Sequence, residues 1–180
     1  MATLKNIADH IIDICENAVR SKSKLCELYI DEDESSFFFK VSDKGIGMDE
    51  QEVKSALDPF YTTKTERKKK FGMGLPFLKY SSELTGGSFK ITSQKGYGTV
   101  VEVLFKKDSI DCQPVGDIAQ AIFSVIYIDQ DIDWYIKRTK NNEAYEINSS
   151  EMKKEYGEAF FSPVFMKSIK DLITSLENEF

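Results

Sequence analysis

The sequence lacks the features that a membrane-spanning, secreted or metal-binding protein needs. Its best apolar run, AIFSVIYI, is far shorter than the ~18 residues of a membrane span. The amino end, MATLKNIADH, carries charges where a targeting segment needs an apolar core. Only three cysteines are present, without CxxC or His-rich spacing: Cys15, Cys26 and Cys112. We interpret them as reduced core thiols of a cytoplasmic protein, without zinc or a disulfide.

Marks of other function classes are also missing. No GxxxxGK(S/T) motif occurs, which excludes a Walker-type phosphate loop. The net charge of −6 disfavours nucleic acid as the main partner, because a duplex-binding protein usually has a basic face. The single histidine, His10, falls in the first predicted helix, where we expect a surface or boundary position. With 180 residues, 41% of them apolar, the chain has room for one good-sized domain with an appendage.

Hydrophobic periodicity predicts mixed helices and strands up to residue 107. Apolar residues at three- and four-residue steps over residues 4–18 predict a helix, with Thr3 as its N-cap. LCELYI and SFFFKV predict two strands, followed by a short helix over residues 50–57. A helix over residues 75–84 precedes the strands GSFKITSQ and GTVVEVLF, which a turn at KGYG joins. The intervening polar run, DPFYTTKTERKKKFG, predicts a long loop of the kind that often carries function.

The remainder of the chain, after a linker-like DSIDCQPVG, carries no functional motif. GDIAQAIFSVIYI predicts an apolar helix, and IDWYIKRT and EAYEIN predict a β-hairpin with NN at its turn. Ser149 or Ser150 is expected to cap a short helix that ends at Gly157. PVFMKSIKDLITSL predicts an amphipathic final helix. We interpret this helix as packing against the first region; the alternative is a protein-docking surface.

Three groups of residues in the first region suggest chemistry. Asp43 ends a strand and is followed by Gly45 and Gly47, which indicates a sharp bend or a close approach to the backbone, although an ordinary turn gives the same pattern. Asp13 and Asn17 lie one helical turn apart on one face. They are either solvent-exposed, or a proton acceptor and a ligand for magnesium.

The third group is KFGMGLPF, which follows a basic run. Gly72 and Gly74 open a helix, and the amino end of a helix presents free N–H groups and partial positive charge to a phosphate. Basic residues at positions 64 and 67–70 precede it. The combination is either a solvated loop or a mobile lid that closes over a polyphosphate.

Taken in order, these segments resemble a known family. DICENAVR, DKGIGM, DPFYTTK, FGMGLPF and GYGTVVEVLF follow one another as in the ATP-binding domain of the GHKL superfamily: gyrase, the large heat-shock chaperones, histidine kinases and mismatch-repair ATPases. PFYTTK and GMGLPF are most similar to histidine kinases, and the resemblance covers residues 4–106. It implies a Bergerat-type α/β two-layer sandwich, with a mixed sheet covered by helices on one face, and ATP and magnesium as ligands.

The resemblance also implies roles for single residues. The family's counterpart of Asp43 accepts a hydrogen bond from the adenine amino group, and those of Gly45 and Gly47 let the base lie against the backbone. The counterpart of Asn17 holds magnesium, and that of Arg20 lies near the phosphates. The other matches are the lid residues Phe60, Thr62, Thr63 and Lys64, the phosphate-cradling residues Gly72, Gly74 and Leu75, and Thr99, which supports the adenine-binding aspartate.

Two departures from the family pattern bear on activity. Asp13 stands where ATP-hydrolysing members have a glutamate that activates water, so it is the candidate catalytic residue, but its shorter side chain puts hydrolysis in doubt. Ser21 replaces an aromatic residue that many histidine kinases place near the base, so we expect looser packing of adenine.

The resemblance leads to two hypotheses about function. In the first, the protein is a Mg-ATP-dependent ATPase or protein kinase that acts on a partner protein in regulation. It is not a complete histidine kinase, because we expect no room for a phosphoacceptor hairpin. In the second, it is a non-catalytic, ATP-dependent switch. We expect an ATP-binding domain over residues 1–107 and a C-terminal extension over 108–180. The sheet should be short, or completed from elsewhere, because the magnesium-binding helix comes so early.

Overall fold

The computed structural model describes residues 4–59 and 74–180. The described helices are α1 (Ile7–Arg20), α2 (Glu50–Leu57), α3 (Gly74–Leu84), α4 (Ile118–Ile126), α5 (Ser149–Tyr156) and α6 (Pro163–Glu179), with a 3₁₀ turn η1 (Gly157–Phe161). The described strands are β1 (Leu25–Glu32), β2 (Ser36–Asp43), β3 (Ser88–Gln94), β4 (Gly98–Lys106), β5 (Asp133–Lys140) and β6 (Glu143–Asn148). The predicted elements are therefore present in the predicted order.

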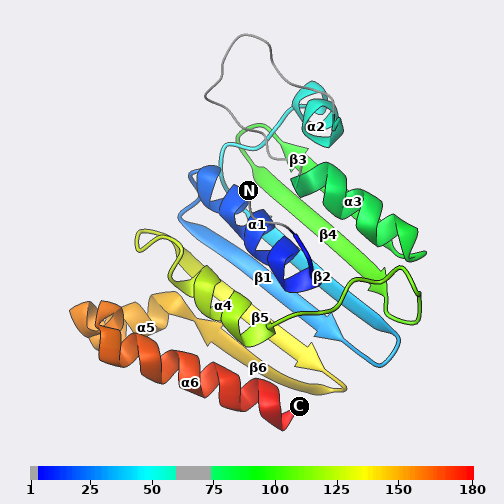
Figure 1. The fold of residues 1–180 in the computed structure, drawn as a ribbon. Coiled ribbons are helices and arrows are strands. Elements are labelled where there is room, and N and C mark those ends of the chain that lie inside the picture. The colour runs from blue at the N-terminus through cyan, green and yellow to red at the C-terminus, as the bar shows by residue number, and fades with distance from the viewer. Residues whose placement is uncertain (1–3, 60–73) are drawn as a thin grey trace.

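The strands form one six-stranded sheet in the order β3-β4-β2-β1-β5-β6 (Figure 1). Strands β1 to β4 pair antiparallel with their neighbours, whereas β5 lies parallel to β1, from Leu25 opposite Asp133 to Glu32 opposite Lys140. The C-terminal strands thus complete the sheet of the first region, which is the second of the two predicted outcomes. Whether residues 1–107 and 108–180 are separate domains stays a prediction.

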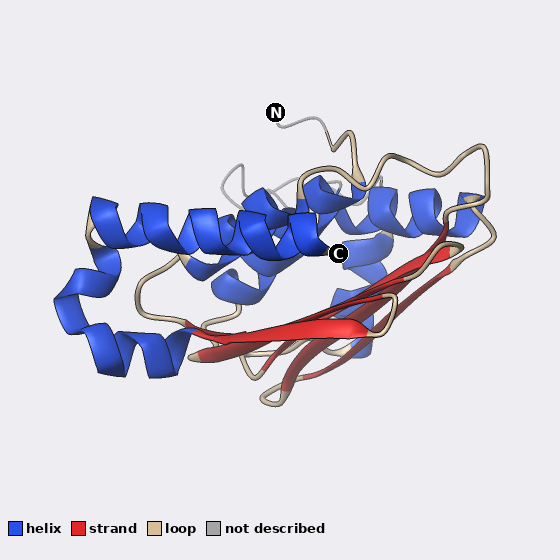
Figure 2. Ribbon diagram, turned by 90° about the horizontal axis from the view of Figure 1, so that it is seen from below, coloured by secondary structure: helices blue, strands red, loops and turns tan. Residues whose placement is uncertain are grey.

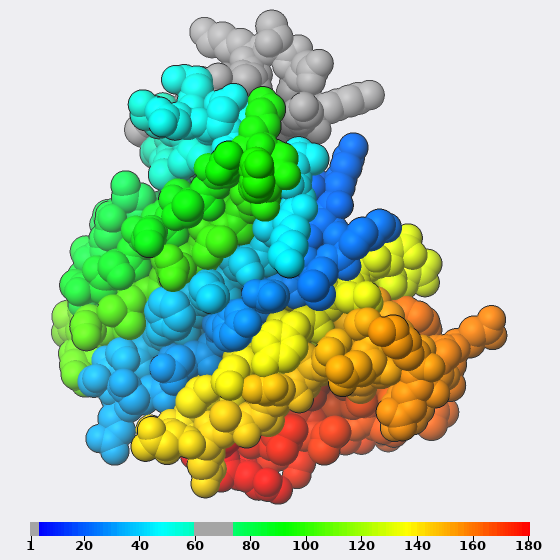
Figure 3. Space-filling view, turned by 180° about the vertical axis from the view of Figure 1, so that it is seen from behind, coloured from blue at the N-terminus to red at the C-terminus, as the bar shows by residue number. Residues whose placement is uncertain are grey.

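The fold has two layers, as predicted. Helices α1, α3, α4 and α6 lie on one face of the sheet (Figure 2), and from the opposite side the strands are visible as adjacent bands (Figure 3). Alternate strand residues point toward the helices, as the burial pattern of β2 shows. The core between the layers includes Ile7, Ile11, Ile14, Leu28, Ile30, Phe37, Phe39, Val103, Phe105, Ile122, Trp134 and Ile136.

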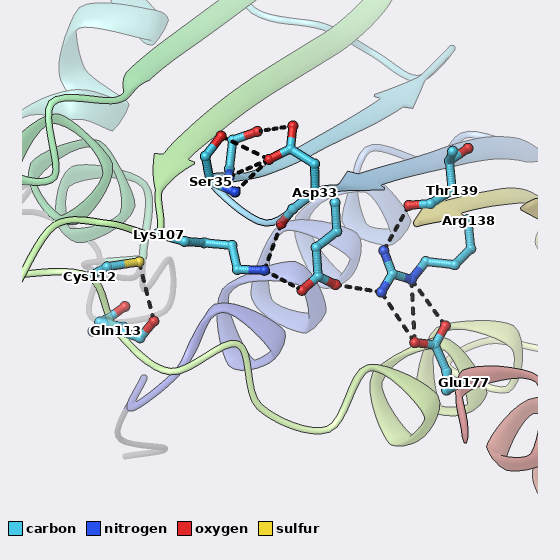
Figure 4. Close-up of polar contacts among 10 residues, drawn as sticks. Asp33, Ser35, Lys107, Cys112, Gln113, Arg138, Thr139 and Glu177 are labelled. Atoms are coloured by element: carbon cyan, nitrogen blue, oxygen red, sulfur yellow. Dashed lines mark hydrogen bonds and ion pairs between the residues drawn. The ribbon is translucent and has the colours of Figure 1, made fainter. Parts of the chain in front are cut away.

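The C-terminal region joins the first region through backbone pairing and a buried ion network. In the linker, the carbonyl groups of Pro114 and Val115 accept hydrogen bonds from the first N–H groups of α1. Arg138 on β5 is 1% exposed and donates to Glu32 (Nη2 to Oε2, 2.6 Å) and to Glu177 of α6 (Nε to Oε1, 3.0 Å; Figure 4). Lys107 donates to the other oxygen of Glu32 at 2.8 Å. One guanidinium group therefore links the first region, the hairpin and the last helix.

Two capping predictions are wrong. The N-cap of α1 is Asn6 rather than Thr3, because Asn6 and Asp9 form a reciprocal capping box. The cap of α5 is Asn148 rather than a serine, since its Oδ1 accepts from the first N–H groups of the helix. The Ser149 hydroxyl does not cap the helix, because it accepts a hydrogen bond from the backbone N–H of Trp134 at 2.8 Å. Sequence patterns alone do not distinguish such adjacent polar candidates.

His10 is also misplaced by the sequence argument, because it is 1% exposed rather than at a boundary. Its ring lies near those of Phe77 and Phe105, and its Nε2 is 2.9 Å from Oε1 of Gln113. The cause is the number of neighbours of α1, which packs on β2, α3 and α4, so that its buried arc is wider than one apolar stripe. Burial lowers the pKa of His10.

The final helix packs differently from our interpretation. Helix α6 lies against α4, which in turn packs on α1. Its inner residues are Ile169 and Ile173, which are 8% and 1% exposed. Through Arg138, Glu177 of α6 is linked to Glu32 of the first region. Helix α6 therefore lies beside α4 in the layer of helices.

Candidate functional site

Helices α1 and α3 bring two of the candidate segments together, that of Asp13 and that of Gly74. The carboxylate of Asp13 lies against Gly74, the first residue of α3, so closely that a Cβ at position 74 would overlap Oδ2 of Asp13. Burial raises the pKa of Asp13, nearby Glu16 adds to this, and Arg20 opposes it. Leu75, the next residue of α3, packs against the core. The aspartate thus sits at the amino end of a helix, where backbone N–H groups are free to bind anions.

One turn after Asp13, Asn17 is half-buried and faces Arg20. The Asn17 Oδ1 accepts a hydrogen bond from Arg20 Nη1 at 3.3 Å, and Arg20 Nη2 is 2.9 Å from Glu16 Oε2. The Arg20 side chain is 63% exposed. Because exposed ion pairs are weak, Arg20 can leave Asn17 at little cost in free energy. Glu16, which the sequence argument did not single out, holds Arg20 in this position.

Asp43, at the end of β2, is 8% exposed and is held by surrounding backbone. Its Oδ1 accepts from the Gly45 N–H at 2.8 Å. Burial raises the pKa of Asp43 above its usual value, against contacts with Ser21, Gly45 and Thr99 that lower it. Thr99 lies opposite Asp43 on β4. A partly desolvated carboxylate with a raised pKa is typical of functional sites.

The hydroxyl of Thr99 points to a residue that the sequence argument missed. Its Oγ1 lies 2.8 Å from Oγ of Ser93, and Ser93 also accepts from the Met48 N–H at 2.8 Å. Ser93 therefore ties the end of β3 to the loop that follows Asp43. A lone serine in a strand gives no sequence signal for this role, because its partners come from two other elements.

The glycines after Asp43 allow three backbone segments to touch. A Cβ at Gly45 would overlap Ser21, and one at Gly47, where φ is +60°, would overlap the carbonyl of Gln94. Across the hairpin, Gly98 has φ of +105° and lies against the carbonyl of Asp43. Side chains cannot occupy these positions without moving backbone. The glycine pattern therefore does more than form a turn: it packs the loop against the end of α1 and the β3–β4 hairpin.

Ser21 connects the two halves of the site. It follows the last residue of α1, one turn after Asn17, and its carbonyl accepts from the Ile46 N–H at 2.9 Å. Its side chain also contacts Asp43. The described candidates thus form one continuous group, from Asp13, Asn17 and Gly74 to Asp43 and its loop. The other candidates, Phe60, Thr62, Thr63, Lys64 and Gly72, lie outside the described residues.

This group of residues offers few oxygen ligands for a hard cation such as magnesium. Among the described residues, no three His, Cys, Asp or Glu side chains are placed to hold a metal ion together. Asn17 offers one amide oxygen, which suits magnesium, since this ion keeps several waters and phosphate oxygens.

No described helix is both long and apolar enough to cross a membrane.

Comparisons with known proteins identify the family of the chain. The family model described as "Histidine kinase-, DNA gyrase B-, and HSP90-like ATPase" matches residues 3–109. The cell-division control histidine kinase PdhS of Brucella anthropi is 32% identical over 119 residues, which cover 58% of this chain and 11% of that protein. PdhS of Brucella ovis is 31% identical over 119 residues, covering 58% of this chain and 12% of that protein. The chain therefore spans only a small part of these relatives' length.

Solved structures show the same fold at low sequence identity. The N-terminal domain of a DNA repair protein has a TM-score of 0.58 at 14% identity, covering 89% of this chain and 58% of that one. The Aquifex aeolicus MutL ATPase domain, complexed with ADP, has a TM-score of 0.57 at 13% identity, covering 88% and 70%. With 88–89% of this chain covered, the likeness in fold extends beyond residues 3–109.

Proposed function

Because the chain belongs to the family of histidine kinase-, DNA gyrase B- and HSP90-like ATPases, we propose that it binds ATP with magnesium and acts as an ATPase or protein kinase on a partner protein. Its ATP-binding, kinase-like module is the part that matches the family. The use of magnesium, the reaction and the partner protein are parts of our proposal that go beyond this family match. In an ATPase a water molecule would accept the phosphoryl group, and in a protein kinase the partner protein would accept it. The partner would be a regulatory protein.

The observation that carries this function is the contact between the amino end of α3 and Asp13 of α1, a helix whose end contacts the loop of Asp43 through Ser21. ATP would lie with its adenine amino group donating to Asp43 and its phosphates toward the amino end of α3. Asn17 would hold the magnesium ion, which supplies positive charge to the phosphates. Arg20 would turn from Asn17 toward the phosphates.

Asp13 would act as the general base. Its burial, which raises its pKa, makes the carboxylate a better proton acceptor than an exposed aspartate. The proton would come from a water molecule or from a hydroxyl group of the partner. The short side chain of aspartate limits its reach, and this is the reason to test the chemistry separately from binding.

Titration calorimetry with ATP and magnesium tests the binding step. Asp43→Asn replaces an acceptor with a group that presents a donor to the adenine amino group, so binding should weaken by roughly 1.5–3 kcal/mol, tenfold or more. Asp33→Asn, in the exposed turn before β2, is the matched control and should bind as the wild type does. Equal affinity of the wild type and Asp43→Asn would rule out this adenine site.

The second candidate function is an ATP-dependent switch without turnover. It is favoured by the same contact, because an Asp13 carboxylate packed on Gly74 can serve to hold α3 in place rather than to move protons. In that case ATP would change how the protein docks a partner, and phosphate release would be absent with and without the partner.

A further inference from the structure

An apolar groove lies at the β6 edge of the sheet, away from β2 and the proposed nucleotide site. It has a volume of about 290 Å³ and lies between β6, α5 and α6. Ile147 of β6, Met152 of α5 and Leu172 and Leu176 of α6 supply apolar surface, and Leu172 is 54% exposed. In Figure 2, α6 runs back over the sheet, whereas α5 lies beyond the end of the strands, and in Figure 3 both lie beside the hairpin. We call this feature the edge groove.

One side of the edge groove is the free edge of a strand. Among the described strands β6 is outermost on this side of the sheet and pairs only with β5. An edge strand presents N–H and C=O groups that can pair with another chain. The side chains of Tyr145 and Ile147 face the helices, since they pair with Arg138 and Ile136, which are buried on that side. A strand added to β6 would therefore direct every second side chain into the groove.

The charge around the groove is acidic. Glu151 and Glu155 of α5 line it, and both are exposed. Glu146 of β6 lines it as well, and none of the lining residues is basic, since the lysines of α5 and α6 lie outside the lining. The groove therefore favours an occupant with basic residues.

A second copy of the chain is a poor occupant. A second copy would bring its own groove glutamates, Glu146, Glu151 and Glu155, to the same edge. Like charges brought close together repel one another. Acidic residues on this edge thus oppose self-pairing while leaving it open to a basic strand.

We propose that the edge groove docks an extended, basic segment of a partner protein, which adds a strand to β6. Its alternate apolar side chains lie against Ile147 and Leu172, and its lysine or arginine residues lie beside Glu151 and Glu155. This docking does not depend on chemistry at the proposed nucleotide site. It supplies a site by which a kinase-like module can hold a partner.

Selection from a displayed library of short random peptides tests this docking, with the full chain as bait and no nucleotide. Enriched peptides should alternate apolar residues with lysine or arginine. Their affinity, measured by fluorescence anisotropy, should fall roughly tenfold or more for Leu172→Glu, because a charge replaces an apolar contact at the centre of the site. Leu84→Glu, at an exposed leucine of α3, is the matched control and should not weaken binding.

Charge and strand pairing need separate readouts. The double change Glu151→Lys with Glu155→Lys should weaken basic peptides, whereas the same changes at Glu50 and Glu83 should not. Peptide binding should slow hydrogen exchange of the β6 amides, and N-methylation along the pairing edge of the peptide should abolish binding.

Four results would overturn the docking mode. The first is enrichment that is equal for the wild type and Leu172→Glu. The second is a set of selected peptides whose apolar residues have helical spacing and whose binding slows hydrogen exchange only in α6. The third is selection of acidic peptides. The fourth is a dimer of the free chain, seen by sedimentation, that Leu172→Glu dissociates, because this would make a second copy the occupant.

Discussion

The surroundings of Asp13 and Asp43 and those of Arg138 both contain buried charge, but the charge is compensated in different ways. Asp13 and Asp43 have raised pKa values, with burial as the main cause. Around Arg138, burial also disfavours charge, but hydrogen bonds from Lys107 and Arg138 lower the pKa of Glu32. Arg138 in turn contacts two carboxylates. The first arrangement leaves charge available to a ligand, whereas the second is closed within the protein.

This difference separates a binding site from a structural link. An uncompensated carboxylate costs stability and is retained where it does chemistry or binds. A network whose members satisfy one another joins distant segments and has no group to spare. The following experiments test this contrast, beginning with the largest expected effect.

The largest effect should come from the pair on α1. Asp13→Ala should leave binding of ATP and magnesium intact and slow single turnover by ~100 to 10,000-fold, the usual contribution of a general base. Asn17→Ala should abolish magnesium-dependent binding itself, because it removes the one proposed protein ligand of the cation. Single-turnover assays with labelled ATP, together with calorimetry, separate the two. If Asp13→Ala weakens binding as much as Asn17→Ala does, Asp13 is structural.

The next effect should be on stability, at the closed network. Arg138→Met leaves the carboxylates of Glu32 and Glu177 without their main partner, and should lower the free energy of unfolding by roughly 3–5 kcal/mol. Lys137→Met, on the neighbouring residue of β5, breaks only an exposed pair with Glu146 and should cost about 0–1 kcal/mol. Urea unfolding measures both. Similar losses for the two variants would mean that Arg138 does not link the regions.

A third effect should come from backbone crowding at the site. Gly47→Ala adds a Cβ against the Gln94 carbonyl, so it should cost roughly 1–3 kcal/mol for overpacking, in addition to the strain of a positive φ. Gly86→Ala, also at positive φ but with no atom within 4 Å of the added Cβ, should lose only the stability that backbone strain costs. Thermal unfolding compares them. Equal losses would show that conformation alone, and not close approach, requires glycine at position 47.

The smallest effect is in the pH dependence of stability, and its sign should differ between the two arrangements. Because the pKa of Glu32 is lowered on folding, Glu32→Gln should destabilise at neutral pH, and the difference should shrink as pH falls below the usual 4.5. Because the pKa of Asp43 is raised, its favourable contribution is present below pH 3.8 and lost as pH rises. Asp43→Asn should therefore gain stability relative to wild type as pH rises.

Urea unfolding at a series of pH values follows both differences. The two carboxylates would be shown to be compensated alike if both variants changed in the same direction. That result would remove the distinction between the open and the closed arrangement.

Much of the fold could be predicted from local pattern. The apolar stripe of α1, the alternation in β2 and the turn residues Asn141 and Asn142, both at positive φ, each report their own conformation. The order of motifs also predicted the family, which the match over residues 3–109 confirms. These features are encoded by neighbours in the chain, so a local reading finds them.

The errors arose where a residue's environment depends on distant segments. His10 is buried because α3 and the linker cover its face of α1, and Ser149 is taken by Trp134 rather than by its own helix. Ser93 contributes to the site because Met48 and Thr99, which belong to other elements, form hydrogen bonds with its hydroxyl group. None of these contacts leaves a signal in the spacing of residues along the chain.

The sequence by itself determined the elements, the family and the residue types available for nucleotide binding, because periodicity, glycine pairs and capping residues act over a few positions. Only the tertiary structure decided that β5 pairs parallel to β1, that Arg138 closes a network with Glu32 and Glu177, and that Asp13 meets Gly74. These contacts join residues far apart in the chain. They form because the apolar faces of helices and sheet must be buried together, and that requirement is met by the whole fold rather than by any one segment.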